Sequence, residues 1–196
     1  MGKRCAKLER KTTETLIDMA LCLDGTGVFD ITTGIGFFDH MLTLFCKHGQ
    51  FDLKVKAVGD IVVDGHHTVE DTGIVLGQAL ARALNDKNGI RRYGTAFVPM
   101  DEALAMVVVD ISGRPYLEYA VDAPAVEIGS YASELTEEFL RALANNAGLT
   151  IHVRLLSGKN SHHIAEAIYK ALGRALADAA RRDDSIVGVM STKGVL

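Results

Sequence analysis

The sequence predicts an α+β protein made of two similar halves, each a ββαβα-type unit whose helices cover one face of a mostly antiparallel sheet. The first observation is a repeated motif, because the pattern HHxxE begins at His66 and again at His162, 96 residues later. The second is that the same shift aligns Gly77 with Gly173 in the apolar segments that follow. The third is that spacings typical of strand, helix, strand and helix occur twice in the same order.

Length and composition fit two small halves that share one core. The chain has 196 residues, of which 48% are hydrophobic and 23% charged, and this is enough apolar material for a folded core. It has only three prolines and no stretch that resembles a linker. We therefore expect a first half, residues 1–93, and a second half, residues 94–196, packed together as one compact unit.

Each predicted element follows from its pattern of apolar residues. Segments 15–23 and 103–110 are apolar enough for strands, and segment 51–56 alternates apolar and polar residues as a half-exposed strand does. Apolar residues spaced three and four apart predict two helices, and Ala- and Leu-rich runs at the HHxxE motifs predict two longer ones. The predicted strands span residues 15–23, 51–56, 103–110 and 149–156. The predicted helices span residues 36–47, 68–84, 135–147 and 162–180.

Composition excludes several classes of protein. The net charge of −4 and the pI near 6.0 argue against a nucleic-acid partner. No apolar stretch approaches the ~18 residues that a membrane span needs, so we expect no membrane partner. The cysteines Cys5, Cys22 and Cys46 share no metal-binding spacing, and we expect free thiols in a reducing compartment. With no targeting segment recognised, we expect a cytoplasmic protein.

The HHxxE motif offers metal ligands in two directions if it begins a helix. Residues four apart lie on one helix face, so His66 and Glu70 are placed to bind the same ion. His67 follows about 100° further around the helix axis and faces a different ion or partner. Residues 162–166 repeat this arrangement. Imidazole and carboxylate donors together suit manganese, iron or zinc better than calcium.

The duplication adds one further candidate ligand to each half. His40, at the start of the first predicted helix, corresponds to Glu138 in the second half, and both side-chain types bind metals. Four ligands for each of two ions, with positions left for substrate or water, are typical of a catalytic site. The eight candidate ligands are His40, His66, His67, Glu70, Glu138, His162, His163 and Glu166.

Several cationic and hydroxyl side chains are candidates for binding a phosphate group. Arg92 and Arg114 offer guanidinium groups, and the run Ser191-Thr192-Lys193 combines hydroxyls, backbone N–H groups and an ammonium. Taken singly, exposed arginines and lysines are more often parts of a solvated surface.

Six segments of the chain together resemble the imidazoleglycerol-phosphate dehydratase family, which are lyases of histidine biosynthesis. The three longest are GFFDHML at 36–42, DGHHTVEDTG at 64–73 and GKNSHHIAEA at 158–167. The match is specific because these long motifs occur in the order found in the family. Residues 10–15, 113–116 and 191–194 also fit the family pattern, so the resemblance covers nearly the whole chain. Glu138 is a departure, since many members of the family carry histidine there.

The resemblance implies more than the residues alone do. It implies two ferredoxin-like halves, two Mn²⁺ ions per active site and a homo-oligomer of twenty-four subunits, built from trimers, with active sites between subunits. It assigns acid–base importance to Glu14, which is not singled out by its own chemistry. The substrate-binding residues that it implies are Glu14, His40, His48, His66, Glu70, Arg92, Arg114, His162, Lys170, Ser191, Thr192 and Lys193.

The implied reaction converts imidazole glycerol phosphate to imidazole acetol phosphate and water. Because no carbonyl flanks the carbon that loses its proton, we hypothesise that two metal ions stabilise an imidazolate, which expels hydroxide to give a diazafulvene. Two alternatives stay open: a dinuclear metal phosphohydrolase, and a non-catalytic metal-binding shell protein. The candidate phosphate-binding residues argue against the shell protein, which has no use for them.

Overall fold

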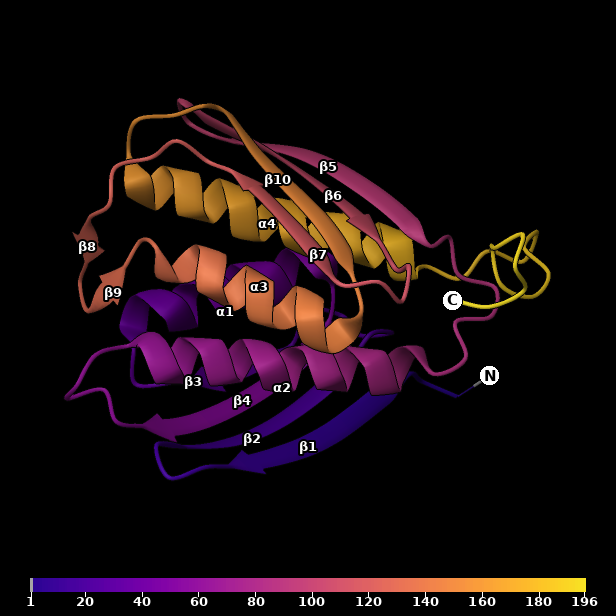
Figure 1. Ribbon diagram of the computed structural model, residues 1–196, viewed down its shortest axis with the longest axis horizontal. Coiled ribbons are helices and arrows are strands. Elements are labelled where there is room, and N and C mark those ends of the chain that lie inside the picture. Colours follow the sequence, from indigo (N-terminus) through magenta and orange to yellow (C-terminus); the bar gives the residue numbers. More distant parts are fainter. Residues whose placement is uncertain (1) are drawn as a thin grey trace.

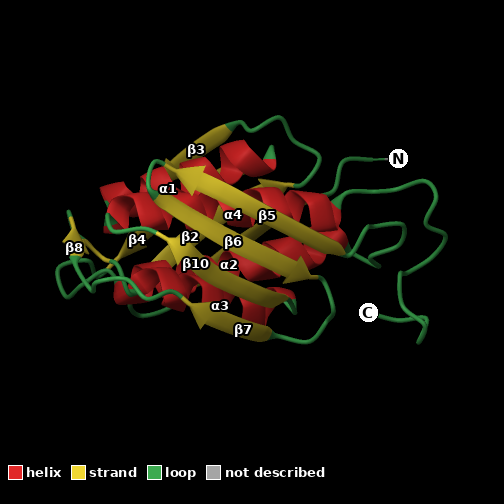
Figure 2. Ribbon diagram, turned by 90° about the horizontal axis from the view of Figure 1, so that it is seen from above, coloured by secondary structure: helices red, strands yellow, loops and turns green. Residues whose placement is uncertain are grey.

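The computed structural model describes residues 2–196 and arranges them in four layers (Figure 1). Two four-stranded sheets form the outer layers, and four helices lie between them. The view from above in Figure 2 shows the strands of one sheet crossing over the helices beneath. Each sheet therefore buries one face against helices and leaves the other outside, as an α+β architecture requires.

The two sheets have the same topology. The first has the order β1-β2-β4-β3, in which β3 runs parallel to β4 and the other pairs are antiparallel. The second has the equivalent order β5-β6-β10-β7, and a short hairpin, β8-β9, precedes the third helix of the chain. The strands are β1 (Cys5–Lys11), β2 (Thr15–Cys22), β3 (Phe29–Thr32), β4 (Asp52–Gly59), β5 (Tyr93–Met100), β6 (Ala103–Asp110), β7 (Tyr116–Ala120), β8 (Glu127–Ile128), β9 (Tyr131–Ala132) and β10 (Thr150–Ser157).

The helices join the two halves through one core. Helix α1 packs against α4 and α2 against α3, so each helix of the first half contacts one of the second. The helices are α1 (Gly36–Gly49), α2 (His66–Leu84), α3 (Leu135–Ala147) and α4 (Ser161–Ala180). None of them is long and apolar enough to cross a membrane, within the part of the chain that the structure describes.

Alternation along the strands decides which sheet face is buried. In β2, Ile17, Met19 and Leu21 are almost fully buried against the helices, while the residues between them lie on the outer face. In β6, residues 103, 105, 107 and 109 are buried in the same way. The period of two therefore directs each apolar row toward the helical layers.

The predicted fold class is confirmed, and the structure adds a strand to each half. The duplicated order is βββαβα, because β3 and β7 lie at a sheet edge in parallel with β4 and β10. These two strands have no buried alternating row, which is why apolar periodicity does not reveal them. Each sheet is mostly antiparallel, as predicted, because only the pairing of its edge strand β3 or β7 is parallel.

Side-chain oxygens accept backbone hydrogen bonds at the starts of both helices that carry HHxxE; the oxygen belongs to the N-cap residue in α4 and to the residue before the N-cap Gly65 in α2. Asp64 Oδ1 accepts a hydrogen bond from the backbone N–H of His66 at 2.8 Å. Asn160 Oδ1 accepts one from the N–H of His162 at 2.9 Å, and Asn160 is the N-cap of α4. Such caps satisfy N–H groups that have no partner within the helix. Both histidine pairs are thereby held in the first turn of a helix.

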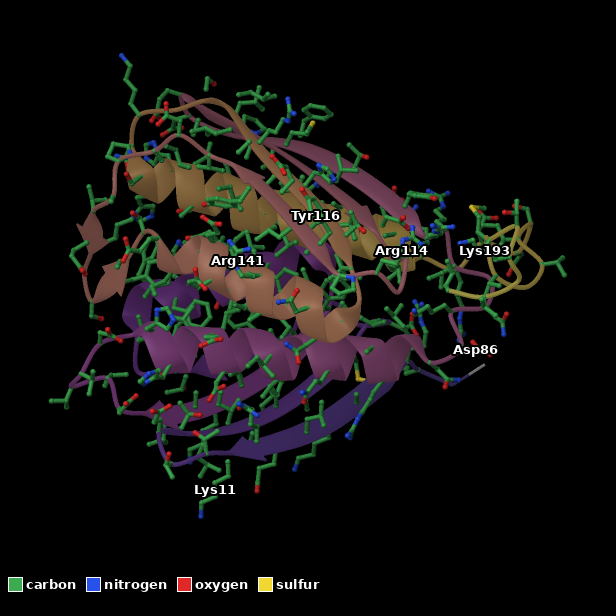
Figure 3. All side chains as sticks on the ribbon, viewed as in Figure 1. Lys11, Asp86, Arg114, Tyr116, Arg141 and Lys193 are labelled. Carbon is green, nitrogen blue, oxygen red and sulfur yellow. A yellow bond between two sulfur atoms is a disulfide. The ribbon has the colours of Figure 1, made fainter. Side chains whose placement is uncertain are left out.

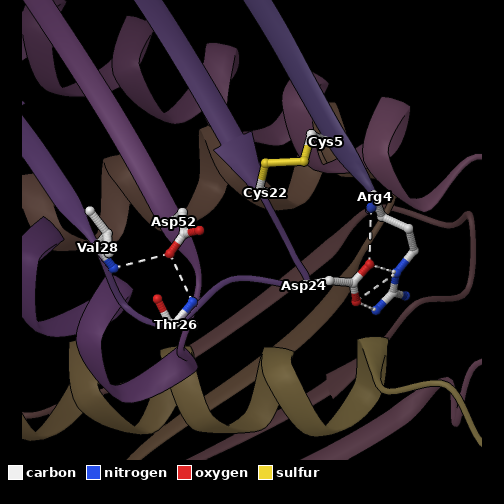
Figure 4. The surroundings of a disulfide bond; sticks show 7 residues. All are labelled: Arg4, Cys5, Cys22, Asp24, Thr26, Val28 and Asp52. Atoms are coloured by element: carbon white, nitrogen blue, oxygen red, sulfur yellow. Dashed lines mark hydrogen bonds and ion pairs between the residues drawn. A yellow bond between two sulfur atoms is a disulfide. The ribbon is translucent and has the colours of Figure 1, made fainter. Parts of the chain in front are cut away.

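The expectation of free thiols is wrong for two of the three cysteines. Cys5 and Cys22 form a disulfide that links β1 to β2, as Figure 4 shows, and only Cys46 is free. Antiparallel pairing puts Cys5 directly opposite Cys22, with their Cα atoms 4.0 Å apart. The spacing of the cysteines in the sequence conceals this pairing, because it depends on the register of a strand that the apolar pattern does not define.

Candidate metal centre

All eight predicted metal ligands lie at one end of the molecule. Figure 1 shows that the four helices begin at the same end, close to the β8-β9 hairpin. Each ligand lies within the first six residues of its helix, as the bounds of α1, α2, α3 and α4 show. We call this the metal-binding end, and the helix starts that define it come from both halves.

Three of the predicted ligands converge within a single chain. His40 Nε2 lies 3.1 Å from Glu166 Oε1, and His162 Nε2 lies 3.0 Å from the same oxygen. These atoms all lie within 4.8 Å of one another, which is the only such group of three among residues 2–196. Two imidazole nitrogens and a carboxylate oxygen at this spacing fit one ion such as manganese, iron or zinc.

The charge of Glu166 is stabilised by its neighbours. Its side chain is almost fully buried, and its other oxygen accepts a hydrogen bond from Lys170 Nζ at 2.5 Å. Burial alone would raise the pKa of this carboxyl group, but the hydrogen bonds from Lys170, His40 and His162 outweigh burial and lower the pKa to about 2. Glu166 is therefore an anionic donor at the centre of the group.

The first HHxxE motif has the predicted local geometry but stays apart from this group. His66 Nε2 lies 3.8 Å from Glu70 Oε2, one helical turn away. The rings of His66 and His67 are 83° apart, and those of the second histidine pair are 82° apart. Adjacent histidines thus face different directions in both motifs. Glu138 lies on the first turn of α3, half-buried, and its carboxylate forms no ion pair within residues 2–196.

The second histidine of each pair is held by a carboxylate that sequence reasoning missed. His67 Nδ1 lies 2.9 Å from Asp60 Oδ2, and His163 Nδ1 lies 2.7 Å from Glu102 Oε2. These contacts raise the pKa of both histidines, and hydrogen bonds from His163 and from backbone N–H groups lower the pKa of Glu102 to about 2. The duplication could have revealed Glu102, because it directly precedes β6 as Glu14 directly precedes β2.

Glu14 lies at the metal-binding end, beside the first HHxxE motif. It occupies the turn between β1 and β2, and its Oε2 atom is 3.8 Å from His67 Nδ1. That distance is too long for a hydrogen bond. The side chain is half-exposed, so its carboxylate is accessible beside the first HHxxE motif.

The predicted phosphate-binding residues gather at the opposite end. Arg92 Nε and Nη2 donate to the two oxygens of Asp110, at 2.7 and 3.1 Å, and Nη1 donates to the Met190 carbonyl. Arg114 is exposed and lies 3.9 Å from the same carboxylate. Arg92 thus anchors the segment that leads into residues 191–193, and Figure 3 shows Arg114 and Lys193 at this end. We call it the cationic end.

His48 lies between the two ends. It is near the end of α1 and lines a cavity of about 600 Å³ together with Lys47, Arg174 and Arg181. Burial and the nearby charges of Lys170 and Arg174 lower its pKa, so its imidazole favours the neutral form. Lys170, which binds Glu166, connects this region to the metal-binding end.

The two ends are a helix length apart within one chain. The backbone N–H of Arg92 donates to the Ala179 carbonyl, at the last turn of α4, whereas His162 lies in the first turn. At 1.5 Å per residue, the helix between His162 and Ala179 spans about 26 Å. A single chain therefore does not bring its metal-binding end and its cationic end together around one small molecule.

The chain is similar to proteins of one family along its whole length. Residues 33–176 match the family model described as imidazoleglycerol-phosphate dehydratase. The imidazoleglycerol-phosphate dehydratase of Acetivibrio thermocellus is 60% identical over 97% of both chains. The one from Clostridium botulinum strain Hall is 59% identical over the full length of both.

Solved structures of the same family share the fold. The crystal structure of the Staphylococcus aureus imidazoleglycerol-phosphate dehydratase has a TM-score of 0.83 and 44% identity, covering 91% of this chain and 99% of that one. The Pyrococcus furiosus structure has a TM-score of 0.84 and 40% identity, covering 96% and 100%.

The duplicated fold, the His and Glu donor group and these relatives define an enzyme of the hydro-lyase class, which removes water from its substrate. Its helix-borne donors are those of a metal-dependent member of that class. The chain belongs to the imidazoleglycerol-phosphate dehydratase family.

Proposed function

We propose that this protein dehydrates imidazole glycerol phosphate to imidazole acetol phosphate in histidine biosynthesis, and that it works in the cytoplasm. The observation that carries the proposal is the convergence of His40, His162 and Glu166 from both halves of the chain. Two manganese ions, when bound there, would supply Lewis acids that stabilise negative charge on the imidazole ring of the substrate. The eight predicted ligands at the metal-binding end are the residues that would hold them.

Glu14 is the residue that we assign to proton transfer. Its half-exposed carboxylate lies at the metal-binding end and forms no hydrogen bond with His67. A carboxylate in that position can take a proton from the substrate carbon and return one to the leaving hydroxyl group. Lys170 of α4, which donates to Glu166, would contact the part of the substrate that extends away from the ions. His48, near the end of α1, would contact the same part of the substrate.

We assign binding of the substrate phosphate to the cationic end. Asp110 and the Met190 carbonyl hold the Arg92 guanidinium in place, while the exposed Arg114 guanidinium lies 3.9 Å from the same Asp110 carboxylate. The hydroxyls of Ser191 and Thr192 and the ammonium of Lys193 would complete a phosphate site of the kind that charge-assisted hydrogen bonds favour.

The active site would be completed between subunits. About 26 Å of helix separates the two ends of one chain, and this is far more than the length of the substrate. If a second copy places its cationic end against the metal-binding end of the first, one substrate molecule can contact both ends. We therefore propose a homo-oligomer with shared sites, and the assembly of twenty-four subunits that the family resemblance implies is one that provides them.

Turnover by metal-depleted and metal-refilled protein tests the proposal. Protein stripped with a chelator is refilled with manganese, and the ketone product and inorganic phosphate are followed separately. We expect ketone to form only with manganese and without release of phosphate. Release of phosphate would instead indicate a metal phosphohydrolase, and tight metal binding without turnover would indicate a shell protein.

The oligomer is tested by its size with and without metal. If the ions join subunits, removing them should convert the large assembly into smaller particles such as trimers. Size-exclusion chromatography with light scattering measures this directly. A particle size that stays the same after complete metal removal would contradict ions that bridge subunits.

A further inference from the structure

We propose that Glu102 is a positioning residue that holds His163 through Nδ1 and so presents the Nε2 atom of that histidine to the metal. The inference rests on the proposed metal-dependent function and adds a residue outside the predicted ligand set. Glu102 lies in the turn between β5 and β6, whereas His163 lies in the first turn of α4, 61 residues later. The contact therefore joins two elements of the second half at the metal-binding end.

The two oxygens of Glu102 have different partners. Oε2 accepts a hydrogen bond from His163 Nδ1 at 2.7 Å. Oε1 accepts hydrogen bonds from the backbone N–H groups of Lys159 and Asn160, at 3.2 and 2.9 Å. The loop before α4 thus fixes the carboxylate, and the carboxylate in turn fixes the imidazole ring.

This arrangement determines which ring nitrogen can bind a metal. A neutral imidazole has one N–H and one lone pair, and a carboxylate at Nδ1 keeps the hydrogen on that atom. The lone pair of His163 is then on Nε2, which lies 3.8 Å from Asp101 Oδ2, too far for a hydrogen bond. Nε2 is also the nitrogen through which His40 and His162 approach Glu166 in the group of three. Carboxylates behind metal-bound histidines typically orient the ring and increase its basicity.

The first half contains an equivalent contact between a carboxylate and the Nδ1 atom of a histidine, made by a different residue. Asp60 Oδ2 lies 2.9 Å from His67 Nδ1, and His67 is the duplicate of His163. Asp60 comes from the loop after β4, whereas Glu102 comes from a hairpin turn, so the two carboxylates are not duplicates of each other. Two unrelated segments that place a carboxylate on the same nitrogen indicate a requirement of the site, which packing alone does not explain.

The variant Glu102→Gln tests the positioning of the His163 ring separately from the hydrogen bonds that Glu102 makes to the loop before α4. The amide oxygen of glutamine can still accept the two backbone N–H groups, which leaves its NH₂ group facing His163. His163 Nδ1 must then accept a hydrogen bond, so the ring hydrogen moves to Nε2 and the lone pair is lost from the metal side. The loop keeps its hydrogen bonds while the histidine tautomer is inverted.

The experiment measures manganese affinity and the tautomer of the histidine ring. Free Mn²⁺ is counted by electron paramagnetic resonance during titration, and ¹⁵N resonances of ring-labelled histidine report which nitrogen carries the hydrogen. We expect Glu102→Gln to weaken manganese binding about 10- to 100-fold, the usual cost of losing such a partner, with an unchanged circular dichroism spectrum. Asp18→Asn is the control, since it removes a carboxylate from the outer face of the first sheet.

The outcomes distinguish this inference from the proposed function. If the unmodified protein binds manganese and turns over substrate while Glu102→Gln binds manganese equally well, the positioning role is wrong. If the unmodified protein neither binds manganese nor turns over, the proposed function itself fails. Should Glu102→Gln not fold, Asp60→Ala tests the same principle at His67, and unaltered manganese affinity there would overturn it.

Discussion

Glu14 and Glu102 occupy equivalent positions before the second strand of each half, yet they have different surroundings. Glu102 is hydrogen-bonded to His163 and to two backbone N–H groups. Glu14 lies 3.8 Å from His67, because Asp60 already occupies the position behind that ring. One carboxylate of the duplicated pair is therefore held by three hydrogen bonds, whereas the other stays accessible for the proton transfer that we propose for it.

Glu14→Gln should abolish turnover while leaving the metal content and the assembly unchanged. The amide cannot accept the proton, and losing such a group lowers rates by about 10²- to 10⁴-fold. Steady-state kinetics with manganese-loaded protein measures the loss, and elemental analysis and light scattering give metal content and size. A variant that loses its assembly would show that Glu14 is structural.

Helix contacts between the halves depend on two glycines that the duplication aligns. Gly77 of α2 lies against α3, where an added Cβ would be 2.9 Å from the Leu143 carbonyl oxygen. Gly173 of α4 lies against α1, where an added Cβ would be 2.4 Å from the Phe45 carbonyl oxygen. Both obstacles are backbone atoms, so the helices could accommodate a methyl group only by moving apart.

Gly173→Ala should destabilise the protein by about 1–3 kcal/mol, the usual cost of overpacking. The clash outweighs the gain of roughly 1 kcal/mol that alanine brings to a helix interior. Gly36→Ala is a matched control, because nothing lies within 4 Å of the Cβ position at the start of α1. Urea unfolding measures both variants, and equal midpoints for Gly173→Ala and the unmodified protein would contradict the close contact.

At the scale of the whole molecule, Arg4 links the first strand to the end of the last helix. Its guanidinium binds both oxygens of Asp24, and it also donates to the Ala180 carbonyl at 2.6 Å. Figure 4 shows the ion pair next to the disulfide between Cys5 and Cys22. The N-terminal segment is thus attached to its neighbouring strand covalently and to the other half by hydrogen bonds.

Asp24→Asn should lower stability at neutral pH by about 1–2 kcal/mol, an amount that allows for the partial exposure of Asp24. The hydrogen bonds from Arg4 hold the pKa of Asp24 below its ordinary value of 3.8 in the folded state. The unfolded state therefore binds more protons, and this contribution is fully present above pH 3.8 and disappears as pH falls through the folded pKa. Metal-free urea unfolding of both proteins from pH 7 to pH 2.5 should show the difference shrinking, and a constant difference would contradict it.

Periodic apolar patterns predicted the elements that they define most strongly. The strand over Ala103–Asp110 and the helix over Leu135–Ala147 have the predicted bounds, because each buries one regular row of side chains. Strands β1 and β5 were given no bounds by the prediction. Strands β3 and β7 were not predicted, since they are short, lie at sheet edges and lack such a row. The disulfide between Cys5 and Cys22 depends on strand register, which the spacing of two cysteines does not encode.

The candidate site was predictable in its ligand types and only partly in its arrangement. Repeated HHxxE motifs predict helix starts with ligands facing two ways, and the ring angles in both pairs agree. The meeting of His40 with Glu166 is a tertiary contact between α1 and α4, which no local pattern specifies. Asp60 was missed because a single loop carboxylate has no pattern of its own.

The separation of the metal-binding end from the cationic end has a genetic consequence. If each active site takes one end from one subunit and the other end from a neighbour, a chain damaged only at His162 can be rescued by a chain damaged only at Lys193. Randomly mixed assemblies of His162→Ala and Lys193→Ala would contain one intact site in four, formed by the undamaged ends of the two kinds of chain. Co-expression of the two inactive variants should therefore restore about a quarter of the activity, limited by the random pairing of subunits. No recovery in assemblies proven to be mixed would mean that each chain supplies both ends of its own site.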